Sequence, residues 1–298
     1  MATRLVLALL GLSLPLAGCA LREEPTGPAE LRVTRDFGAE ELATGRTPRV
    51  AAGQTVLGFL QDERDVEVDG GAVRSIDGLA GAWTYFVNGS APGATARRRA
   101  LAPGEVIQWD LRPDDGPARR VPAIVGAFPE PFRSGFGGRK VPVRVECDDD
   151  RSVACRRVKD RLAAVGVAAS GARLNTEAGP GVLRVIVAPW RAASTVAAAG
   201  VVGRGPAESG VFARFGRRGR RLDLLDSSGR NARPAPPGTG LVAATQATGQ
   251  RPVWVVTGVQ RAGVERAATA LDPRVLRHAY AVAVTPTAVE RLPLPPGG

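Results

Sequence analysis

The chain has 298 residues, of which 44% are hydrophobic and 5% aromatic, and its formal net charge is +11. This length and apolar content are sufficient for two domains with real cores. The single histidine, His278, leaves few ways to build a Ser-His-Asp triad or a zinc site, so an enzyme is less favoured than a binding protein.

The first 18 residues have the layout of a secretory signal. Arg4 is followed by an apolar run over residues 5–16, which is shorter than the roughly 20 residues that span a bilayer. Leu16-Ala17-Gly18-Cys19 then resembles the lipobox of bacterial lipoproteins. The resemblance implies a signal peptide over 1–18, a lipid on Cys19 and an extracytoplasmic protein anchored at the cell membrane. The alternative is an ordinary secretory signal with a chance cysteine.

The remaining chain divides by composition. Residues 19–29 are polar and contain proline, which predicts a short lipidated tether. Residues 30–132 and 141–298 each carry alternating apolar patterns, and residues 133–140 between them are a glycine-rich linker. The sequence therefore predicts an α+β protein with two domains.

The positive charge is unevenly distributed. Residues 1–140 hold 17 Lys or Arg and 17 Asp or Glu, whereas residues 141–298 hold 23 and 12. A basic second domain beside a membrane favours anionic lipid or an anionic wall polymer as partner. The alternative is a solvated arginine-rich surface. The chain carries no nucleic-acid motif, and nucleic acid is not an expected partner of an exported lipoprotein.

The first domain combines one helix pattern, over residues 55–62, with four strand patterns, over residues 31–36, 73–76, 83–87 and 105–111. Asn88-Gly89 is a strong signal for a tight turn after the aromatic strand. The segments at 33–39, 54–57, 75–78, 83–89 and 104–110 resemble the transcobalamin-like C-terminal domain family. That resemblance implies a β-grasp-type fold and a role in binding. In the vitamin B12 carriers of this family the domain covers one side of cobalamin, and a helical barrel forms the other side of the site. No pattern in this sequence indicates such a barrel, so no cofactor is expected.

The aromatic strand supplies the candidate ligand-binding residues: Trp83, Tyr85 and Asn88, with Trp109 behind them. Trp83 and Tyr85 share one face of the strand, and Phe86 lies on the other. The alternative is that one of these aromatic sets belongs to the core.

The second domain alternates strands and helices, which predicts an α/β domain with a mixed sheet. Strands are expected at 141–147, 182–188, 253–257 and 280–284, and a hairpin at 211–225. Helices are expected at 151–165, 190–199, 241–248 and 262–271.

Three further features of the second domain carry candidate sites. Cys147 and Cys155 form an even pair in an exported protein, which predicts a disulfide. The run from Asp148 to Asp150 precedes a helix and is either a helix cap or a calcium site. The loops Gly238-Thr239-Gly240 and Thr257-Gly258 could together bind an anion, although ordinary turns are the default interpretation. No metal site is expected.

The function that these patterns favour is a lipid-anchored extracytoplasmic module that binds a ligand or a partner. An enzyme of the cell envelope with its site in residues 141–298, and a purely structural envelope protein, remain the alternatives.

Overall fold

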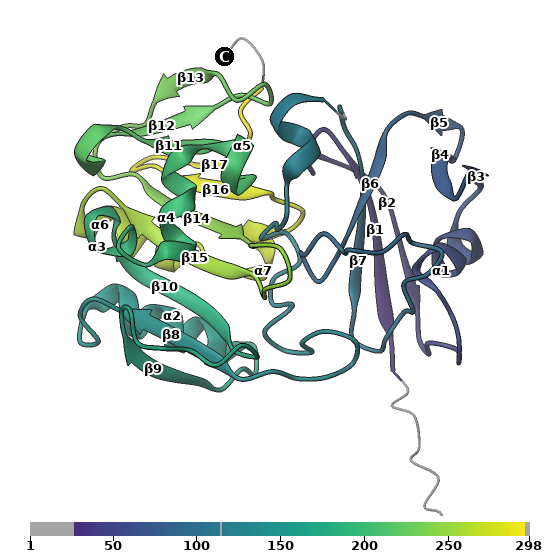
Figure 1. The fold of residues 1–298 in the computed structure, drawn as a ribbon, viewed down its shortest axis with the longest axis horizontal. Helices are drawn as coiled ribbons and strands as arrows, with labels where there is room; N and C mark the ends of the chain where they lie inside the picture. The colour runs from purple at the N-terminus through teal and green to yellow at the C-terminus, as the bar shows by residue number, and fades with distance from the viewer. Residues whose placement is uncertain (1–26, 114, 296–298) are drawn as a thin grey trace, which may run out of the picture.

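A computed structural model describes residues 27–113 and 115–295. The predicted signal peptide, Cys19 and most of the predicted tether lie outside the described residues. Within the described part of the chain, no helix is long and apolar enough to cross a membrane. The fold is α+β, with two main sheets in two units that lie side by side and share an interface (Figure 1).

The first unit is built on a four-stranded mixed sheet of order β2-β1-β7-β6. Strand β1 is parallel to β7, and the other neighbours are antiparallel. The elements are β1 (Ala29–Arg35), β2 (Glu40–Thr47), α1 (Val56–Glu63), β3 (Val66–Asp69), β4 (Ala72–Ile76), β5 (Leu79–Ala80), β6 (Trp83–Val87), β7 (Val106–Leu111) and the 3-10 helix η1 (Gly116–Arg120). Strands β3, β4 and β5 form a small separate sheet.

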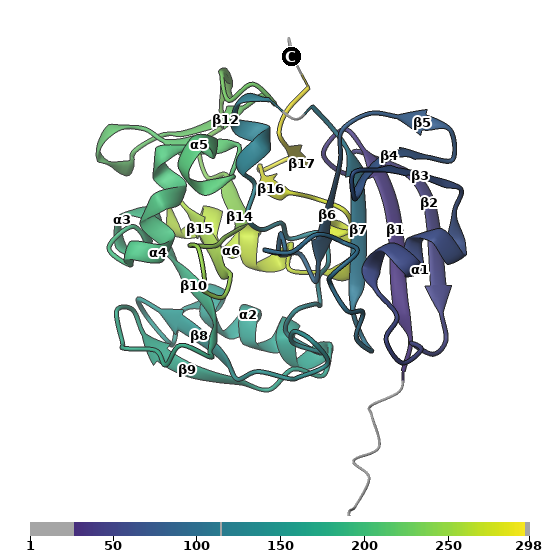
Figure 2. The same cartoon turned by 45° about the vertical axis from the view of Figure 1, so that its right-hand side comes forward.

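Helix α1 covers the outer face of the first sheet (Figure 2). The Thr55 hydroxyl caps its first turn by accepting a hydrogen bond from the Gly58 amide. Phe59 and Leu60 of the helix are fully buried against Leu31 and Ile107 of the sheet. The apolar spacing in residues 56–60 therefore places one helix face on the sheet.

The second unit contains a seven-stranded mixed sheet of order β17-β16-β14-β15-β10-β8-β9. Its strands are β8 (Val143–Cys147), β9 (Ala169–Arg173), β10 (Leu183–Pro189), β14 (Gly240–Thr245), β15 (Val253–Gly258), β16 (Ala281–Val284) and β17 (Val289–Leu292). The other elements are α2 (Val153–Ala164), α3 (Trp190–Ala193), α4 (Ala197–Gly200), η2 (Val201–Arg204), α5 (Pro206–Ser209), β11 (Ala213–Phe215), η3 (Arg217–Gly219), β12 (Leu222–Leu225), β13 (Asn231–Pro234), α6 (Arg261–Thr269) and α7 (Pro273–Leu276).

Both faces of this sheet are covered. Helices α2 and α6 pack on one face, where Val158 and Leu162 meet the β8 and β10 side chains. Helices α3 and α4 and the small sheet β11-β12-β13 cover the other face. Central strands buried on both sides have continuous apolar sequences, as in the fully buried strands β14 and β15.

The inner face of the first sheet packs against the second unit. Phe86 of β6 and Phe37 contact the ring of Tyr280, with centroids 5.5 and 5.3 Å apart. Residues 121–136 also join the two units, because Phe128 and Phe132 are buried against Trp254 of β15. Within the segment 133–140, Gly135 is buried and Phe136 packs against the same cluster, whereas Arg133, Gly137, Arg139 and Lys140 are exposed.

Two predicted helices were wrong. Residues 241–248 were expected to be helical, but residues 240–245 form β14 in the centre of the large sheet. Its small and branched side chains are all buried, so alternation gives no signal that would separate a strand from a buried helix. The helix expected at 190–199 is broken into α3 and α4, with the chain extended at Val196.

Candidate functional site

Most of the predicted aromatic site packs against the core of the first unit. The Tyr85 ring stacks on Trp109 with centroids 4.9 Å apart, and its hydroxyl donates a 2.6 Å hydrogen bond to the Ala94 carbonyl. Burial raises the pKa of Tyr85 to about 12. The Trp83 indole donates to the Leu79 carbonyl, and Trp109 is only 3% exposed. Trp83 and Tyr85 are both half-buried, so each also presents an edge to solvent.

Asn88 is buried and organises the turn that follows the aromatic strand. Its φ angle is +51°, a conformation that asparagine adopts more readily than most residues. Its side chain donates to the Gly135 carbonyl at 2.7 Å and accepts from the Val106 amide at 2.8 Å. Gly89 must be a glycine here, because a Cβ would lie 2.5 Å from the Ile124 carbonyl oxygen. Asn88 thus fixes the turn from which residues 90–94 extend.

Residues 90–94 form one wall of a cavity of about 550 Å³ between the two units, called the interdomain cavity below. Its opposite wall is the loop between β14 and β15, residues 246–252, called the cleft loop. Val87, Arg99, Phe136 and Pro180 complete the lining. None of the described residues that line it is acidic.

Three buried polar atoms of residues that line this cavity have no hydrogen-bond partner among the described residues. They are Ser90 Oγ, Gln246 Oε1 and Arg251 Nε. Ser90 is 7% exposed and comes from the first unit, whereas Gln246 and Arg251 belong to the cleft loop. The Arg251 guanidinium lies 5.0 Å from the ring centroid of Phe136, which orients it without supplying a hydrogen-bond acceptor.

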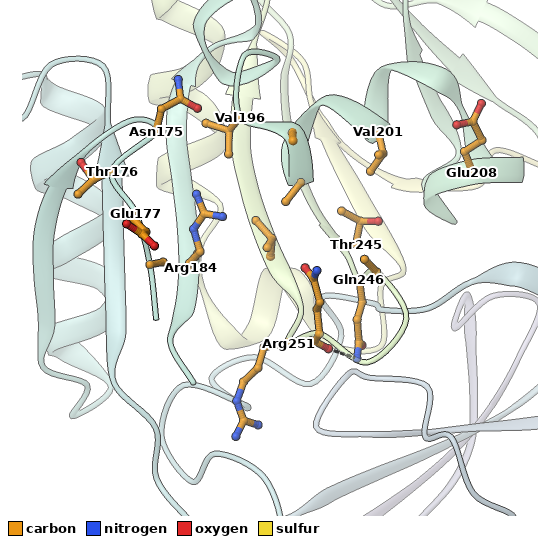
Figure 3. Close-up of a pocket in the computed structure, with 16 residues that line it drawn as sticks. Asn175, Thr176, Glu177, Arg184, Val196, Val201, Glu208, Thr245, Gln246 and Arg251 are labelled. Atoms are coloured by element: carbon orange, nitrogen blue, oxygen red, sulfur yellow. Dashed lines mark hydrogen bonds between the residues drawn. The ribbon is translucent and has the colours of Figure 1, made fainter. Parts of the chain in front are cut away.

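A second cavity of about 550 Å³ lies on the other side of the cleft loop (Figure 3). We call it the hairpin cavity, because residues of the hairpin formed by β14, the cleft loop and β15 line part of it. Its lining mixes apolar residues with polar residues of both charges, among them Asn175, Glu177, Arg184, Glu208 and Gln246. Figure 3 shows the Arg251 side chain pointing away from Arg184. Gln246 spans the cleft loop by donating a 2.7 Å hydrogen bond to the Gln250 carbonyl.

A buried ion pair supports one wall of the hairpin cavity. Glu146, with a fully buried side chain, accepts two 2.7 Å hydrogen bonds from Arg184 and two more from Arg144. Burial acts to raise the pKa of Glu146, but the two guanidinium groups outweigh it and hold that pKa below its usual value. Arg144 also donates to the carbonyls of Thr176 and Glu177, which fixes the loop that lines the cavity.

The two glycine loops, residues 238–240 and 257–258, are adjacent. They lie at the end of strands β14 and β15 that is opposite to the cleft loop, where Gly240 pairs with Gly258. The first loop opens a strand rather than the helix that was predicted. Space between the loops and α6 is small, because a Cβ on Gly240 would lie 2.0 Å from the Gly263 carbonyl oxygen. The hydroxyls of Thr239 and Thr257 donate to backbone carbonyls. Anion binding here stays a prediction.

The disulfide prediction is confirmed, since Cys147 and Cys155 are bonded and connect the end of β8 to α2. At the start of α2, the Ser152 hydroxyl caps the helix and Asp149 accepts from the Arg151 amide. His278 is buried and contacts the Glu41 carboxylate across the interface between the units. Within the described residues, no three His, Cys, Asp or Glu side chains are grouped so as to hold a metal ion.

Comparison with known proteins adds little to this geometry. No family model matches the chain, and no curated protein matches it. One similar solved structure is that of a protein from Ruminococcus gnavus whose description proposes metal binding. It is 11% identical, covers 28% of this chain and 94% of its own, and has a TM-score of 0.23. A likeness at this level carries no argument about the present chain.

The sequence did not point to Ser90, Gln246 or Arg251. Ser90 directly follows the Asn-Gly turn, which was predicted, so its position at a turn was readable. Gln246 and Arg251 lie at the end of a segment expected to be helical and in the loop that follows it. Their meeting with Ser90 depends on how the two units pack, which no local pattern encodes.

Proposed function

We propose that this chain is a lipid-anchored extracytoplasmic binding protein whose ligand occupies the interdomain cavity. The observation that carries the proposal is the set of three buried polar atoms without partners, contributed by both units around one cavity. An unsatisfied buried polar group costs about 1–3 kcal/mol. Each atom has less than 1 Å² of accessible surface, so a ligand in the cavity would supply the missing partners, and recover that free energy, after the side chains that cover these atoms shift.

The lining favours an anionic ligand that also carries a hydrogen-bond donor. Arg251 offers an unpaired Nε–H, and a guanidinium is well suited to a carboxylate or a phosphate. Gln246 Oε1 accepts a hydrogen bond, and the Ser90 hydroxyl either donates or accepts. The absence of acidic side chains from the described lining fits the same ligand class.

The resemblance of the first unit to the transcobalamin-like, β-grasp-type family supports a binding role for this part of the chain. In this proposal the aromatic strand serves the site indirectly. Tyr85 fixes the Ala94 carbonyl, and Asn88 fixes the turn before Ser90, so both residues position the cavity wall. Trp83 and Tyr85 are not needed as direct contacts.

The ligand is tested by comparing the intact protein with two variants, Arg251→Gln and Ser90→Ala. The three proteins are purified natively from membranes, and small molecules that are released on denaturation are identified by mass spectrometry. We expect an acidic compound with the wild-type protein and at least a tenfold lower yield with Arg251→Gln. Arg220→Gln, an exposed change elsewhere, is the matched control. Inorganic phosphate, acetate and cobalamin are then titrated while the melting temperature is followed. Equal recovery of all compounds from every variant would reject the site.

The anchor is tested separately. Cys19→Ser should release the protein from the membrane fraction or leave its signal uncleaved, because the thiol that carries the lipid is absent. Unchanged attachment of this variant would refute lipidation at Cys19 and would leave the cavity prediction untouched.

A further inference from the structure

The described chain begins at one end of the molecule, among three segments that are far apart in sequence. The Gly27 carbonyl accepts a 3.0 Å hydrogen bond from the Val50 amide, and the Pro28 carbonyl accepts one of 2.7 Å from the Gly104 amide. A Cβ placed on Gly27 would lie 3.2 Å from that of Pro103. Residues 46–50 and 97–104 therefore surround the point at which the chain enters the fold.

The segment 133–140 belongs to the same surface. The Gly137 amide donates a 3.1 Å hydrogen bond to the Glu105 carboxylate, and a Cβ on Gly138 would lie 3.6 Å from that of Ala102. A Cβ on Gly104 would meet the Ser134 side chain. We call the surface made by residues 46–50, 97–104 and 133–140 the tether face.

The tether face is strongly basic. Its three segments contain eight basic residues and no acidic one: Arg46, Arg49, Arg97, Arg98, Arg99, Arg133, Arg139 and Lys140. All but Arg99 are exposed. Two buried carboxylates beneath it, Glu105 and Glu130, are paired with Arg99 and Arg133. Asp62 and Glu63 of α1 border the face, near Gln54 and Gly45, and do not cancel the excess.

This clustering is hidden in the sequence totals, where residues 1–140 carry no net charge. The acidic residues of the first unit lie mainly elsewhere, for example at Glu40 and Glu41 at the other end of the sheet and at Asp65 to Asp69 around β3. Folding thus separates the charges of a neutral segment into a basic end and more acidic surroundings.

The short length of chain between Cys19 and Gly27 limits how far the tether face can lie from a lipid on Cys19. Gly27 lies eight positions after Cys19 in the sequence, and an extended chain reaches at most about 29 Å over that length. A lipid on Cys19 would therefore keep the tether face close to the headgroups. Attraction between exposed charges acts within a Debye length of about 10 Å at 0.1 M salt.

We propose that the tether face docks on anionic lipid headgroups, so that the protein lies against the membrane in one orientation. The proposal rests on the lipid anchor for its geometry. It offers, in place of the basic second half as a whole, a defined surface drawn from the first unit and the segment 133–140. Arg99 and Phe136 belong both to these segments and to the lining of the interdomain cavity, so docking would hold that cavity near the membrane surface.

The direct test uses the mature chain from Ala20 onward, without lipid, and vesicles of phosphatidylcholine with or without phosphatidylglycerol. Each basic residue near an anionic surface contributes about fivefold to binding. The triple variant Arg49→Gln, Arg97→Gln and Arg139→Gln should therefore bind the anionic vesicles about a hundredfold more weakly. High salt should weaken the binding of the unmodified chain in the same direction.

The matched control removes the same charge from the β11-β12-β13 end of the second unit, through Arg214→Gln, Arg218→Gln and Arg220→Gln. That end lies at the upper edge of Figure 1, whereas β1 begins at the lower edge. The control should bind within a fewfold of the unmodified chain, and both triple variants should keep its melting temperature. Equal losses in the two triple variants would show that net charge alone matters, and binding without preference for phosphatidylglycerol would also overturn the proposal.

A second readout uses the lipidated full chain on the same vesicles. Trypsin cleavage after Arg97, Arg98 and Arg139 should be slowed on anionic vesicles relative to neutral ones, while cleavage after Arg220 should not change. Equal cleavage on both vesicles would overturn docking. Because the vesicle assay needs no lipid on the protein, its result is independent of whether Cys19→Ser releases the chain, and the failure of either proposal can be recognised.

Discussion

The hydroxyl of Tyr280 donates a 2.8 Å hydrogen bond to the carboxylate of Asp110, which joins the two units through their buried interface. The other carboxylate oxygen accepts from the Thr34 hydroxyl at 2.6 Å and from the Gly38 amide at 3.0 Å. Burial raises the pKa of Asp110 above its usual value, and the three donors together with Arg112 oppose that rise. The carboxylate is thus a buried group with little tolerance for losing a donor.

Tyr280→Phe should therefore destabilise the protein. It removes a donor from a fully buried carboxylate and keeps the ring that packs on Phe37 and Phe86. We expect the free energy of unfolding to fall by about 1–3 kcal/mol, measured by urea denaturation. Tyr85→Phe, which removes a less buried hydroxyl bond, is the comparison and should cost less. A Tyr280→Phe protein as stable as wild type would mean that Asp110 does not depend on this donor.

His278 should make stability depend on pH. Burial lowers its pKa to about 4, and the nearby Arg32 and Arg277 add to this, against the opposing effect of Glu41. Between about pH 6.5 and pH 4 the unfolded chain binds a proton that the folded chain does not, so this residue makes stability fall as pH falls. The slope is at most about 1.4 kcal/mol per pH unit.

The measurement is urea denaturation at several pH values, with His278→Asn as the comparison. Asparagine tolerates the φ angle of +63° at this position and does not titrate. The difference in unfolding free energy between the two proteins should change in favour of the variant as pH falls below about 6.5. A constant difference would show that His278 titrates alike in both states.

Reduction of the Cys147–Cys155 disulfide should lower stability moderately. The bond closes a loop of eight residues in sequence separation, and a loop this short contributes about 2–3 kcal/mol by restricting the unfolded chain. The double variant Cys147→Ala and Cys155→Ala should unfold at lower urea concentration than wild type under oxidising conditions. Adding reductant should bring the wild type close to the variant and leave the variant unchanged. A double variant that unfolds at the same urea concentration as the oxidised wild type would show that the disulfide does not stabilise the fold.

The aromatic strand should prove structural. Trp109→Ala should cost about 3–5 kcal/mol, as expected for a buried aromatic, and Trp83→Ala and Tyr85→Ala should each cost less because their side chains are half-buried. Thermal denaturation ranks the three. If Trp83→Ala and Tyr85→Ala left the melting temperature unchanged and abolished ligand recovery, the two residues would be direct contacts and the site would need to be enlarged toward the strand.

Local patterns predicted the elements with strong periodicity or clear turns. The aromatic strand with its Asn-Gly turn, the amphipathic helix α2 and the disulfide were all readable, because each depends on neighbouring residues. Strand β14 was not, since Gly240–Thr245 is buried on both faces and lacks alternation. Strand β2 was missed for the opposite reason: it is a polar edge strand, rich in charged residues.

The candidate cavity was beyond prediction from local patterns. Ser90 and Gln246 are separated by more than half the chain, and they line one cavity because the two units pack together, for example through Phe86 and Tyr280. The same packing explains the role of Phe86. Its face of strand β6 forms part of the interface between the units. Long-range packing, rather than composition, sets what these residues can do.

The first sheet is buried on both faces, and this affects how the protein unfolds. Phe37 and Phe86 of the first unit pack on Tyr280 of the second, so unfolding of one unit exposes apolar surface of the other to water. The two units should therefore unfold cooperatively. A single calorimetric endotherm is the natural behaviour of such a molecule. Any occupant of the space between the units would then raise the midpoint of the whole transition, which lets a heat-capacity scan serve as a search for the natural ligand.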